Sequence, residues 1–199
     1  ADGMLPSAEA WQRIVLSPGR LEMPFSRNVI VLGDAAAQYE PLAWTNLHLA
    51  VLSIELLLEL LPGHPISESE RREYNRRWTW LADRTADYVR AHYAGTRVSG
   101  SFWKRATALH MSTNLARALA EFERRARLPT HGDDSVQQDQ WYQLLLGIGV
   151  PASPNARQLA MREDEKRAIV RNFQRKAQIA TNVGQSYGHW LSQNYGVCL

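Results

Sequence analysis

The sequence has little that would indicate a secreted or membrane-spanning protein. Its 199 residues include a single cysteine, Cys198, so no internal disulfide can form, which fits a reducing compartment. The longest apolar run, residues 47–61, is shorter than the ~20 residues that span a bilayer, and it contains His48, Glu55 and Glu59. We therefore expect a cytoplasmic protein with no membrane segment, in which residues 47–61 form a core helix.

The sequence also lacks a strong excess of charge of either sign. Lysine and arginine number 23 against 20 acidic residues, which gives a formal net charge of +3, and the arginines are spread along the chain. Such a pattern does not predict a nucleic-acid-binding surface. No internal repeat or low-complexity tract is present, and a chain of this length can bury roughly 70% of its unfolded surface in one or two domains.

The most informative stretch begins with the apolar, β-branched residues 29–32. This run is short enough to be a strand buried on both faces. Gly33 ends the strand, Asp34 follows it, and the alanines after Asp34 leave the backbone open to a diffusible ligand. Thr45 or Asn46 can then cap a long apolar helix whose N-terminus faces the same place. Strand end, carboxylate and helix start are expected to converge on one ligand.

The remaining pattern predicts a mainly α fold with a small β contribution. A first strand is predicted at residues 11–16, a loop at 96–103 and a helix stop at Gly147-Ile148-Gly149. Ser67 and Glu70 are spaced as a capping box for one of the helices. Helices are predicted at about residues 46–61, 67–93, 112–126, 136–146, 163–181 and 185–193.

Two sets of polar residues resemble metal sites only superficially. His48, Glu55 and Glu59 share one face of the predicted helix, but carboxylates spaced in this way are common on helices and no fourth ligand is near. Residues 131–134, His-Gly-Asp-Asp, lie in a connector between helices. No metal site is predicted.

Several groups of residues, taken in order, resemble landmarks of the flavin-dependent tryptophan halogenase family over residues 14–192. The G-[DNL]-A-[AS] turn and the E-P-L-E-S-T segment of that family are similar to Gly33-Asp34-Ala35-Ala36 and Glu40-Pro41-Leu42-Ala43-Trp44-Thr45. Its Y-N, R-D-F-x-x-x-H-Y, F-W and later Trp-Gly-Pro landmarks are similar to Tyr74-Asn75, residues 87–93 (DYVRAHY), Phe102-Trp103 and residues 141–151 (WYQLLLGIGVP). His92 belongs to one of these helix landmarks, so we expect it to be structural.

The resemblance implies an FAD-binding, glutathione-reductase-like α/β flavoenzyme of which this chain would be the C-terminal helical part. The dinucleotide fingerprint G-x-G-x-x-G of that family occurs nowhere in the sequence, so most of the flavin-binding sheet is expected in a missing N-terminal part. Residues 1–45 would be the end of the FAD-binding domain, with two strands and the flavin-contacting turn. Residues 46–199 would be a helical substrate-side domain, and some exposed surface would normally pack against the missing part.

The same resemblance implies residues that bind the cofactor. Gly33, Asp34 and Ala35 match the flavin-contacting turn, where Asp34 would accept hydrogen bonds from ribityl hydroxyls. Pro41 and Leu42 match the segment that lines the isoalloxazine ring.

The halide and catalytic positions come next along the chain. Thr45 matches the halide-site threonine, and Asn46 stands where the family has a glycine whose amide also holds the halide. Ala43 replaces the glutamate that faces the catalytic lysine of the N-terminal part, and Trp44 replaces a serine. A methyl group cannot take a proton from a cationic ring intermediate, so the usual second catalytic group is absent. Glu40 is the family's first glutamate and lies on a different side of the turn.

Three interpretations remain open. The first is a halogenase-like oxidoreductase of altered chemistry that acts on a tryptophan- or indole-like substrate, with reduced FAD from a flavin reductase and with halide as an optional reactant. The second is a flavin monooxygenase of the same fold, and the third is a degenerate, non-catalytic helical binding module. In all three, the isolated chain is expected to be inactive.

Overall fold

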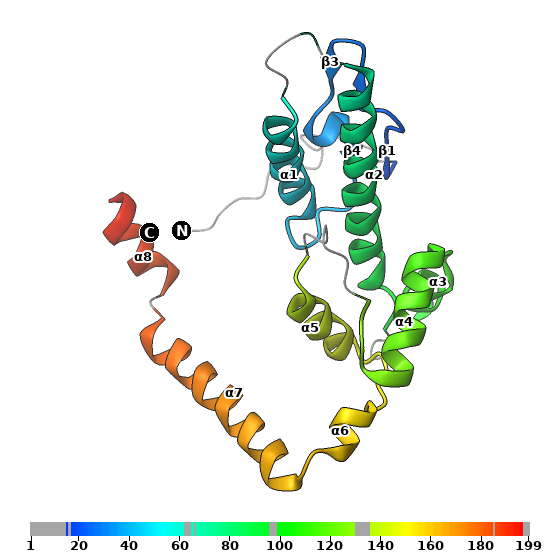
Figure 1. Cartoon of the computed structure of the whole chain (residues 1–199). Helices are drawn as coiled ribbons and strands as arrows, with labels where there is room; N and C mark the ends of the chain where they lie inside the picture. Colours follow the sequence, from blue (N-terminus) through cyan, green and yellow to red (C-terminus); the bar gives the residue numbers. More distant parts are fainter. Residues whose placement is uncertain are drawn as a thin grey trace. The chain divides into compact units, whose positions relative to one another are not determined.

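The computed structural model describes residues 15, 17–61, 65, 67–95, 99–129, 136–184 and 186–196. The chain forms two compact units, residues 1–153 and 154–199 (Figure 1). Among the residues just named, the first unit contains the strands β1 to β4, the 3-10 helix η2 and the helices α1 to α5, and the second contains α6 to α8. The mainly α fold class with a small β contribution is confirmed. The predicted division at residue 45 concerns a whole enzyme and stays a prediction.

The strands are shorter than predicted. Among the described residues there are four strands of two residues each, β1 (Gly19–Arg20), β2 (Phe25–Ser26), β3 (Val29–Ile30) and β4 (Ala37–Gln38). β1 pairs with β4 and β2 pairs with β3, both antiparallel. The prediction of a strand over residues 29–32 buried on both faces is therefore wrong. The side chain of Val29 is 58% exposed, because β2 is the only described strand beside it. The strand predicted at 11–16 lies outside the described residues, except for Val15.

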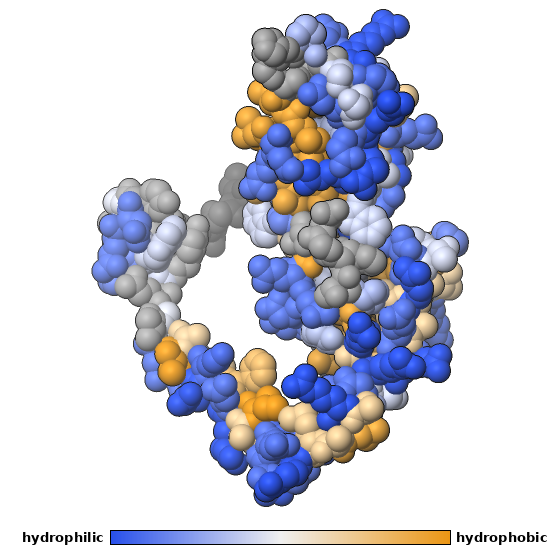
Figure 2. All heavy atoms as spheres, in the orientation of Figure 1, coloured by the Kyte–Doolittle hydropathy of each residue, from blue (hydrophilic) through white to orange (hydrophobic). Residues whose placement is uncertain are grey.

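The helix α1 (Thr45–Glu59) has two different sides. Its inner side is buried in the first core through Thr45, Leu49, Ser53 and Leu56. Its other side carries apolar side chains that stay at the surface, visible as hydrophobic atoms over α1 in Figure 2. The prediction of a core helix thus holds for one side of α1 only.

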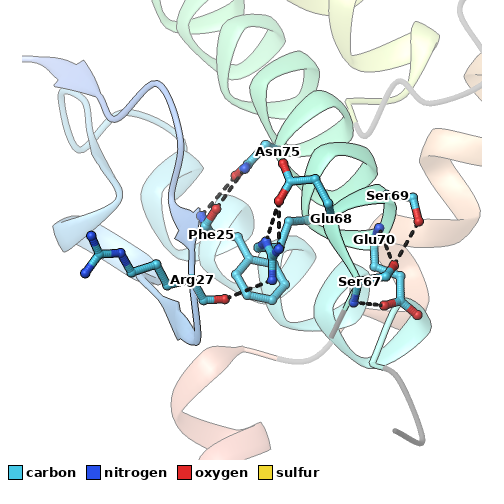
Figure 3. A network of polar contacts seen from close by, with 8 residues as sticks. Phe25, Arg27, Ser67, Glu68, Ser69, Glu70 and Asn75 are labelled. Atoms are coloured by element: carbon cyan, nitrogen blue, oxygen red, sulfur yellow. Dashed lines mark hydrogen bonds and ion pairs between the residues drawn. The ribbon is translucent and has the colours of Figure 1, made fainter. Parts of the chain in front are cut away.

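The helix α2 (Glu68–Ala91) begins at the predicted capping box. The Ser67 hydroxyl accepts a hydrogen bond from the Glu70 N–H, and the Glu70 carboxylate accepts one from the Ser67 N–H at 2.7 Å (Figure 3). Further along, the Asn75 amide bonds to both the N–H and the C=O of Phe25 at 2.9 Å each (Figure 3). These bonds fix β2 onto α2.

The first core lies between α1 and α2. Trp78 Nε1 donates to the Ser53 hydroxyl at 3.2 Å, and the Tyr74 ring packs edge-to-face on Phe25 with ring centroids 5.7 Å apart. Trp78, Tyr74 and Ser53 are almost fully buried. Their polar groups are paired, as burial requires, because the Ser53 hydroxyl donates to the Leu49 carbonyl at 2.6 Å and the Tyr74 hydroxyl to the Ser53 carbonyl at 3.4 Å. The further members of this core are Ala36, Ala37, Tyr39, Leu49, Leu56, Ala82 and Val89.

The second core is formed by the end of α2 with α4 (Thr113–Arg125) and α5 (Gln138–Ile148). Ser112 caps α4 by accepting from the Leu115 N–H, and Gly149 ends α5 at a φ of 86°, where glycine has no steric cost. The helix stop is therefore confirmed at Gly149. The core residues are Ala91, Leu115, Ala118, Leu119, Phe122, Leu128, Trp141, Leu145 and Val150.

The helix α3 (Ser101–Ala108) begins within the loop predicted at residues 96–103 and includes its last three residues, so the prediction is wrong for residues 101–103. No helix was predicted for residues 104–108. A helix of eight residues is too short to be stable alone. The Arg90 guanidinium of α2 donates to the carbonyls of Thr107, Leu109 and His110 at the C-terminus of α3. A cation at this end of a helix pairs with its last carbonyl groups, and this contact distant in sequence stabilises α3.

The second unit consists of α6 (Ala156–Ala160), α7 (Glu163–Val183) and α8 (Tyr187–Tyr195). The predictions of α7 and α8 are confirmed within about two residues, whereas α6 was not predicted. Among the described residues, no helix combines the length and apolar character needed to cross a bilayer.

Candidate functional site

The turn predicted to contact a ligand is a 3-10 helix, η2 (Gly33–Ala35). Gly33 has a φ of 60°, which favours glycine, and a Cβ added there would meet nothing within 4 Å. The Ala36 N–H donates to the Gly33 carbonyl at 2.9 Å and closes the turn. The backbone of Gly33 is therefore open on the side where a Cβ would stand.

Asp34 and Ala35 are exposed, whereas the next two alanines, Ala36 and Ala37, are buried in the first core. The buried alanines hold η2 in place and leave the Asp34 carboxylate at the surface. η2 also packs against α1, so the turn and the helix meet as predicted. Asp34 makes no hydrogen bond to any other described residue, and its carboxylate is free to accept bonds from a ligand.

The segment between the turn and α1 contains two strained residues. Ala43 and Trp44 have φ values of 51° and 57°, in the left-handed region that costs residues with a side chain about 1–2 kcal/mol each. Such strain is often found at functional sites. Pro41 is exposed and Leu42 half-buried, and Trp44 is 80% exposed.

Neither Thr45 nor Asn46 caps α1, so that prediction is wrong. The N-cap is Trp44, which has no capping side chain. Thr45 is buried, and both its N–H (3.1 Å) and its hydroxyl (2.9 Å) donate to the Leu42 carbonyl. The Asn46 amide accepts from the Tyr39 N–H at 3.1 Å and donates to the Tyr39 carbonyl at 2.9 Å. Both side chains hold the turn, and halide binding at Thr45 would require its N–H to change partner.

Glu40 connects this segment to the end of α2. The Tyr93 hydroxyl donates to the Glu40 carboxylate across 53 residues of sequence. This hydrogen bond raises the pKa of Tyr93 to about 12, since the neighbouring carboxylate opposes loss of the phenolic proton. Residues 40–45 and residues 87–93, which the sequence analysis identified as separate landmarks, are thus in direct contact.

Tyr93 also belongs to an aromatic cluster with Phe102 and Trp103 of α3. The Phe102 and Trp103 rings lie edge-to-face at 5.2 Å, and their centroids are 6.4 Å and 6.0 Å from that of Tyr93. Phe102 is 54% exposed. The sequence contained the adjacent aromatic pair, but nothing in its local pattern placed the pair beside Tyr93 or assigned it to a site.

The other candidate polar residues have structural roles or lie apart. His92 Nδ1 is 2.9 Å from the Tyr88 carbonyl one turn earlier, which fits the structural role expected for it. His48 and Glu55 are exposed, and Glu59 pairs with Arg77 of α2 at 2.6 Å. In the described part of the chain, no three His, Cys, Asp or Glu side chains gather as a metal site requires. Most of the connector at 129–134 lies outside the described residues.

A buried polar group joins α2 to the N-cap of α4. The Asp87 carboxylate accepts a hydrogen bond from the Ser112 hydroxyl at 2.7 Å and lies 3.9 Å from the Arg84 guanidinium. Burial raises the pKa of Asp87, and the Ser112 hydrogen bond and the Arg84 charge only partly oppose this rise. The Arg84 guanidinium in turn lies over the Trp80 and Trp141 rings, at 5.9 Å and 5.3 Å from their centroids.

Solved structures of flavin-dependent halogenases share this arrangement of elements. Xcc4156 from Xanthomonas campestris superposes with a TM-score of 0.79 at 22% identity, over 93% of this chain and 39% of that one. BrvH from Brevundimonas sp. BAL3 superposes with a TM-score of 0.78 at 19% identity, over 88% of this chain and 36% of that one. The fold is therefore that of part of a flavin-dependent halogenase.

Sequence comparison also leads to the flavin-dependent halogenases. The family model for tryptophan halogenase matches residues 3–164. Tryptophan 7-halogenase KtzQ from Kutzneria sp. (strain 744) is 23% identical over 138 residues, and tryptophan 7-halogenase RebH from Lentzea aerocolonigenes is 21% identical over 169 residues. These matches cover 69% and 76% of this chain, but 26% and 32% of the relatives. The chain belongs to the tryptophan halogenase family and spans about a quarter to a third of the length of these curated relatives.

Proposed function

We propose that this chain is the C-terminal part of an FAD-dependent, halogenase-like oxidoreductase that acts on an aromatic substrate such as tryptophan or an indole. Residues 1–45 would end the FAD-binding domain, and residues 46–199 would form a helical substrate-side domain. The observation that carries the proposal is the exposed η2 turn, which presents Asp34 beside α1 in a chain of the tryptophan halogenase family. A flavin reductase would supply the reduced cofactor, and the enzyme would work in the cytoplasm.

The residues of η2 fit the cofactor. Gly33 leaves open space in front of the backbone, Ala35 adds only a methyl group, and the Asp34 carboxylate has no partner among the described residues. A carboxylate accepts hydrogen bonds from hydroxyl groups such as those of a ribityl chain. Pro41 and Leu42, which are exposed and half-buried, would line the ring system. When bound, FAD would supply the oxidation of halide or substrate by oxygen.

The aromatic cluster is the proposed contact for the substrate. Aromatic rings attract one another in edge-to-face or offset stacks with centroids 4.5–7 Å apart, and Phe102 presents an exposed ring for such a contact. The hydrogen bond from Tyr93 to Glu40 holds this cluster to the segment that leads from η2 into α1. Substrate and cofactor would thus be bound by parts of the first unit that are directly joined.

The residues at the catalytic position favour altered chemistry. Ala43 has no acid–base group, and the Trp44 indole stands where a serine is usual. Halide would be held by the amides of Thr45 and Asn46 only if the Thr45 N–H leaves the Leu42 carbonyl. A flavin monooxygenase, which needs no halide site, is therefore the second candidate. A non-catalytic binding module is the third.

The experiment uses the full-length protein that contains this chain, with FAD, a flavin reductase, oxygen, chloride or bromide, and tryptophan or indole. Mass spectrometry of the products distinguishes the candidates. A halogenated ring supports the first, a hydroxylated ring in the absence of halide supports the second, and flavin binding without an aromatic product contradicts both. A protein that binds no flavin contradicts the proposal as a whole.

A further inference from the structure

The helix α3 has little apolar burial to hold it in place. Of its eight residues, Ala106 alone is buried, and Phe102 near its start is 54% exposed. A helix of this length is not stable by itself in water. The position of α3 must therefore be set largely by polar and aromatic contacts with the rest of the first unit.

Arg90, at the end of α2, makes three of these polar contacts. Its Nε donates to the His110 carbonyl at 3.3 Å. Its Nη2 donates to the carbonyls of Thr107 at 3.2 Å and of Leu109 at 2.6 Å. These carbonyls lie in the last turn of α3 and just beyond it, where a helix leaves its carbonyl groups without partners of its own. The planar guanidinium can bind all three because its donors point in fixed directions.

Arg90 has no ion-pair partner among the described residues. Its Nη1 is buried and makes no hydrogen bond there, and burial lowers the pKa of Arg90. A positive charge that is partly removed from water without a carboxylate costs free energy, so a surface salt bridge does not explain this residue. The contacts of Arg90 are directed instead to the end of one short helix.

Tyr93, one turn after Arg90, contacts α3 at two places. Its carbonyl accepts a hydrogen bond from the Thr107 hydroxyl at 3.1 Å. Its ring packs against the rings of Phe102 and Trp103, with centroids 6.4 Å and 6.0 Å apart. The bonds of Arg90 at one end of α3 therefore help to fix the ring contacts at the other end.

We infer that Arg90 is a positioning residue for the aromatic substrate, because it holds the end of α3 and thereby sets where the rings of Phe102 and Trp103 lie. This inference rests on the proposed function, which assigns the aromatic cluster to the substrate. Contacts between aromatic rings depend on the distance and angle between them, so a displaced α3 would bind a substrate ring less tightly. Arg90 is expected to influence substrate binding and not the binding of flavin.

The test measures the Kd of the full-length protein for tryptophan and for indole by calorimetry, without turnover. Arg90→Met removes the three hydrogen bonds but keeps much of the side-chain volume, and the Kd should rise about tenfold, as for the loss of one good aromatic contact. Arg90→Lys keeps the charge without the planar group, and the Kd should rise about threefold. The matched control is Arg72→Met, at an exposed arginine of the same helix, which should leave the Kd within about twofold.

A change of background separates positioning from a general loss of stability. If Arg90 acts through the rings, Arg90→Met should alter the Kd less than about twofold in the Phe102→Ala, Trp103→Ala background. The same increase in both backgrounds, or no increase in either, would overturn the inference. If Arg90→Met does not fold, Arg90→Lys replaces it in both comparisons.

Fluorine NMR of protein labelled with fluorotryptophan reports the position of α3 directly. The Trp103 signal, assigned with Trp103→Phe, should move toward that of solvent-exposed tryptophan in Arg90→Met and stay in place in Arg72→Met. A Trp103 signal that moves, in a protein that binds no aromatic compound, shows that Arg90 places α3 and contradicts the proposed substrate contact. A protein that forms an aromatic product, and whose Kd is the same with Arg90→Met, supports the proposed function and contradicts the role of Arg90.

Discussion

Glu40 and Tyr93 form a hydrogen bond that joins the segment before α1 to the residues just after α2, although their positions in the sequence differ by 53. Glu40 belongs to the segment after η2, the proposed flavin-contacting turn, and Tyr93 belongs to the aromatic cluster with Phe102 and Trp103. The bond therefore couples the proposed cofactor side of the first unit to the proposed substrate side.

The first prediction concerns this bond. Tyr93→Phe removes the hydroxyl that donates to Glu40, and we expect a loss of roughly 0.5–1 kcal/mol in the free energy of unfolding, since the pair is partly solvent-screened. Urea unfolding of the full chain measures it. Tyr88→Phe, five residues earlier on α2, is the control, because the Tyr88 hydroxyl has no hydrogen bond to a described residue. Equal losses in the two variants would show that the Glu40 bond contributes nothing specific.

The second prediction concerns Asp34. In the full-length protein, Asp34→Ala should weaken FAD binding by about 1.5–3 kcal/mol, the range for a hydrogen bond to a charged group. Because Asp34 is exposed and makes no bond to another described residue, the stability of the flavin-free protein should not change. Fluorescence titration gives the Kd of the flavin, and an unchanged Kd would remove Asp34 from the cofactor site.

The third prediction concerns the buried carboxyl of Asp87. Burial raises its pKa, so the folded protein keeps this proton to a higher pH than the unfolded chain does. The resulting stability is fully present below the unfolded pKa of about 3.9 and is lost as pH rises through the folded pKa. Asp87→Asn keeps an acceptor for the Ser112 hydroxyl but has no proton to lose.

Urea unfolding of both proteins at a series of pH values from 3.5 to 7 tests this sign. The stability of the wild-type protein minus that of the variant should fall as pH rises from about 3.9 upward. A difference that grows with pH would mean that attraction between Arg84 and the Asp87 carboxylate outweighs the burial of the charge.

The structural predictions that succeeded depend on local sequence. The capping box of Ser67 and Glu70 needs only a three-residue spacing, and the 24 residues of α2 give a long periodic pattern. The helix α3 was not predicted, because its eight residues are held in place by a contact with Arg90 of another helix. The prediction of a strand buried on both faces at residues 29–32 was wrong, because an apolar, β-branched run predicts a buried strand whether or not a neighbouring strand is present.

In the candidate site, too, local features were predictable and contacts between residues distant in sequence were not. The turn at Gly33 and the start of α1 were predictable, because glycine, alanine and the following apolar run are local signals. The role of Asn46 was not, since its amide bonds to Tyr39 seven residues earlier instead of capping the helix. The contact of Tyr93 with Glu40 and Phe102 depends on how α2 and α3 pack, which no short spacing encodes.

The fourth prediction concerns strain at Ala43. Because Ala43 has a φ of 51°, Ala43→Gly should leave the free energy of unfolding unchanged or raise it by up to about 1 kcal/mol. Ala116→Gly, at an exposed position inside α4, is the control and should lower it by about 1 kcal/mol. If both variants lose the same stability, the left-handed backbone at Ala43 is not present in solution.

The fifth prediction concerns the chemistry at Ala43. If Ala43 stands in place of a catalytic carboxylate while η2 still contacts the flavin, as proposed, the reaction of reduced flavin with oxygen should be separated from the transfer of halogen. In the full-length protein the first should proceed, whereas halogenation of free tryptophan should fall ~10²–10⁴-fold below rates usual for the family, the range for a general acid–base group. The exposed indole of Trp44, in place of a small serine, adds bulk at the start of α1.

The Ala43→Glu, Trp44→Ser variant tests this explanation directly. It restores the carboxylate and the small side chain together, and halogenation of tryptophan, measured by mass spectrometry with FAD, a flavin reductase and bromide, should increase. Trp44→Ser alone is the control for bulk, because it opens the same space without an acid–base group. Chlorotryptophan or bromotryptophan produced by the unchanged protein at ordinary rates would show that another group performs the proton transfer. An increase with Trp44→Ser alone, equal to that of the double change, would assign the loss to crowding by the indole instead of to the missing carboxylate.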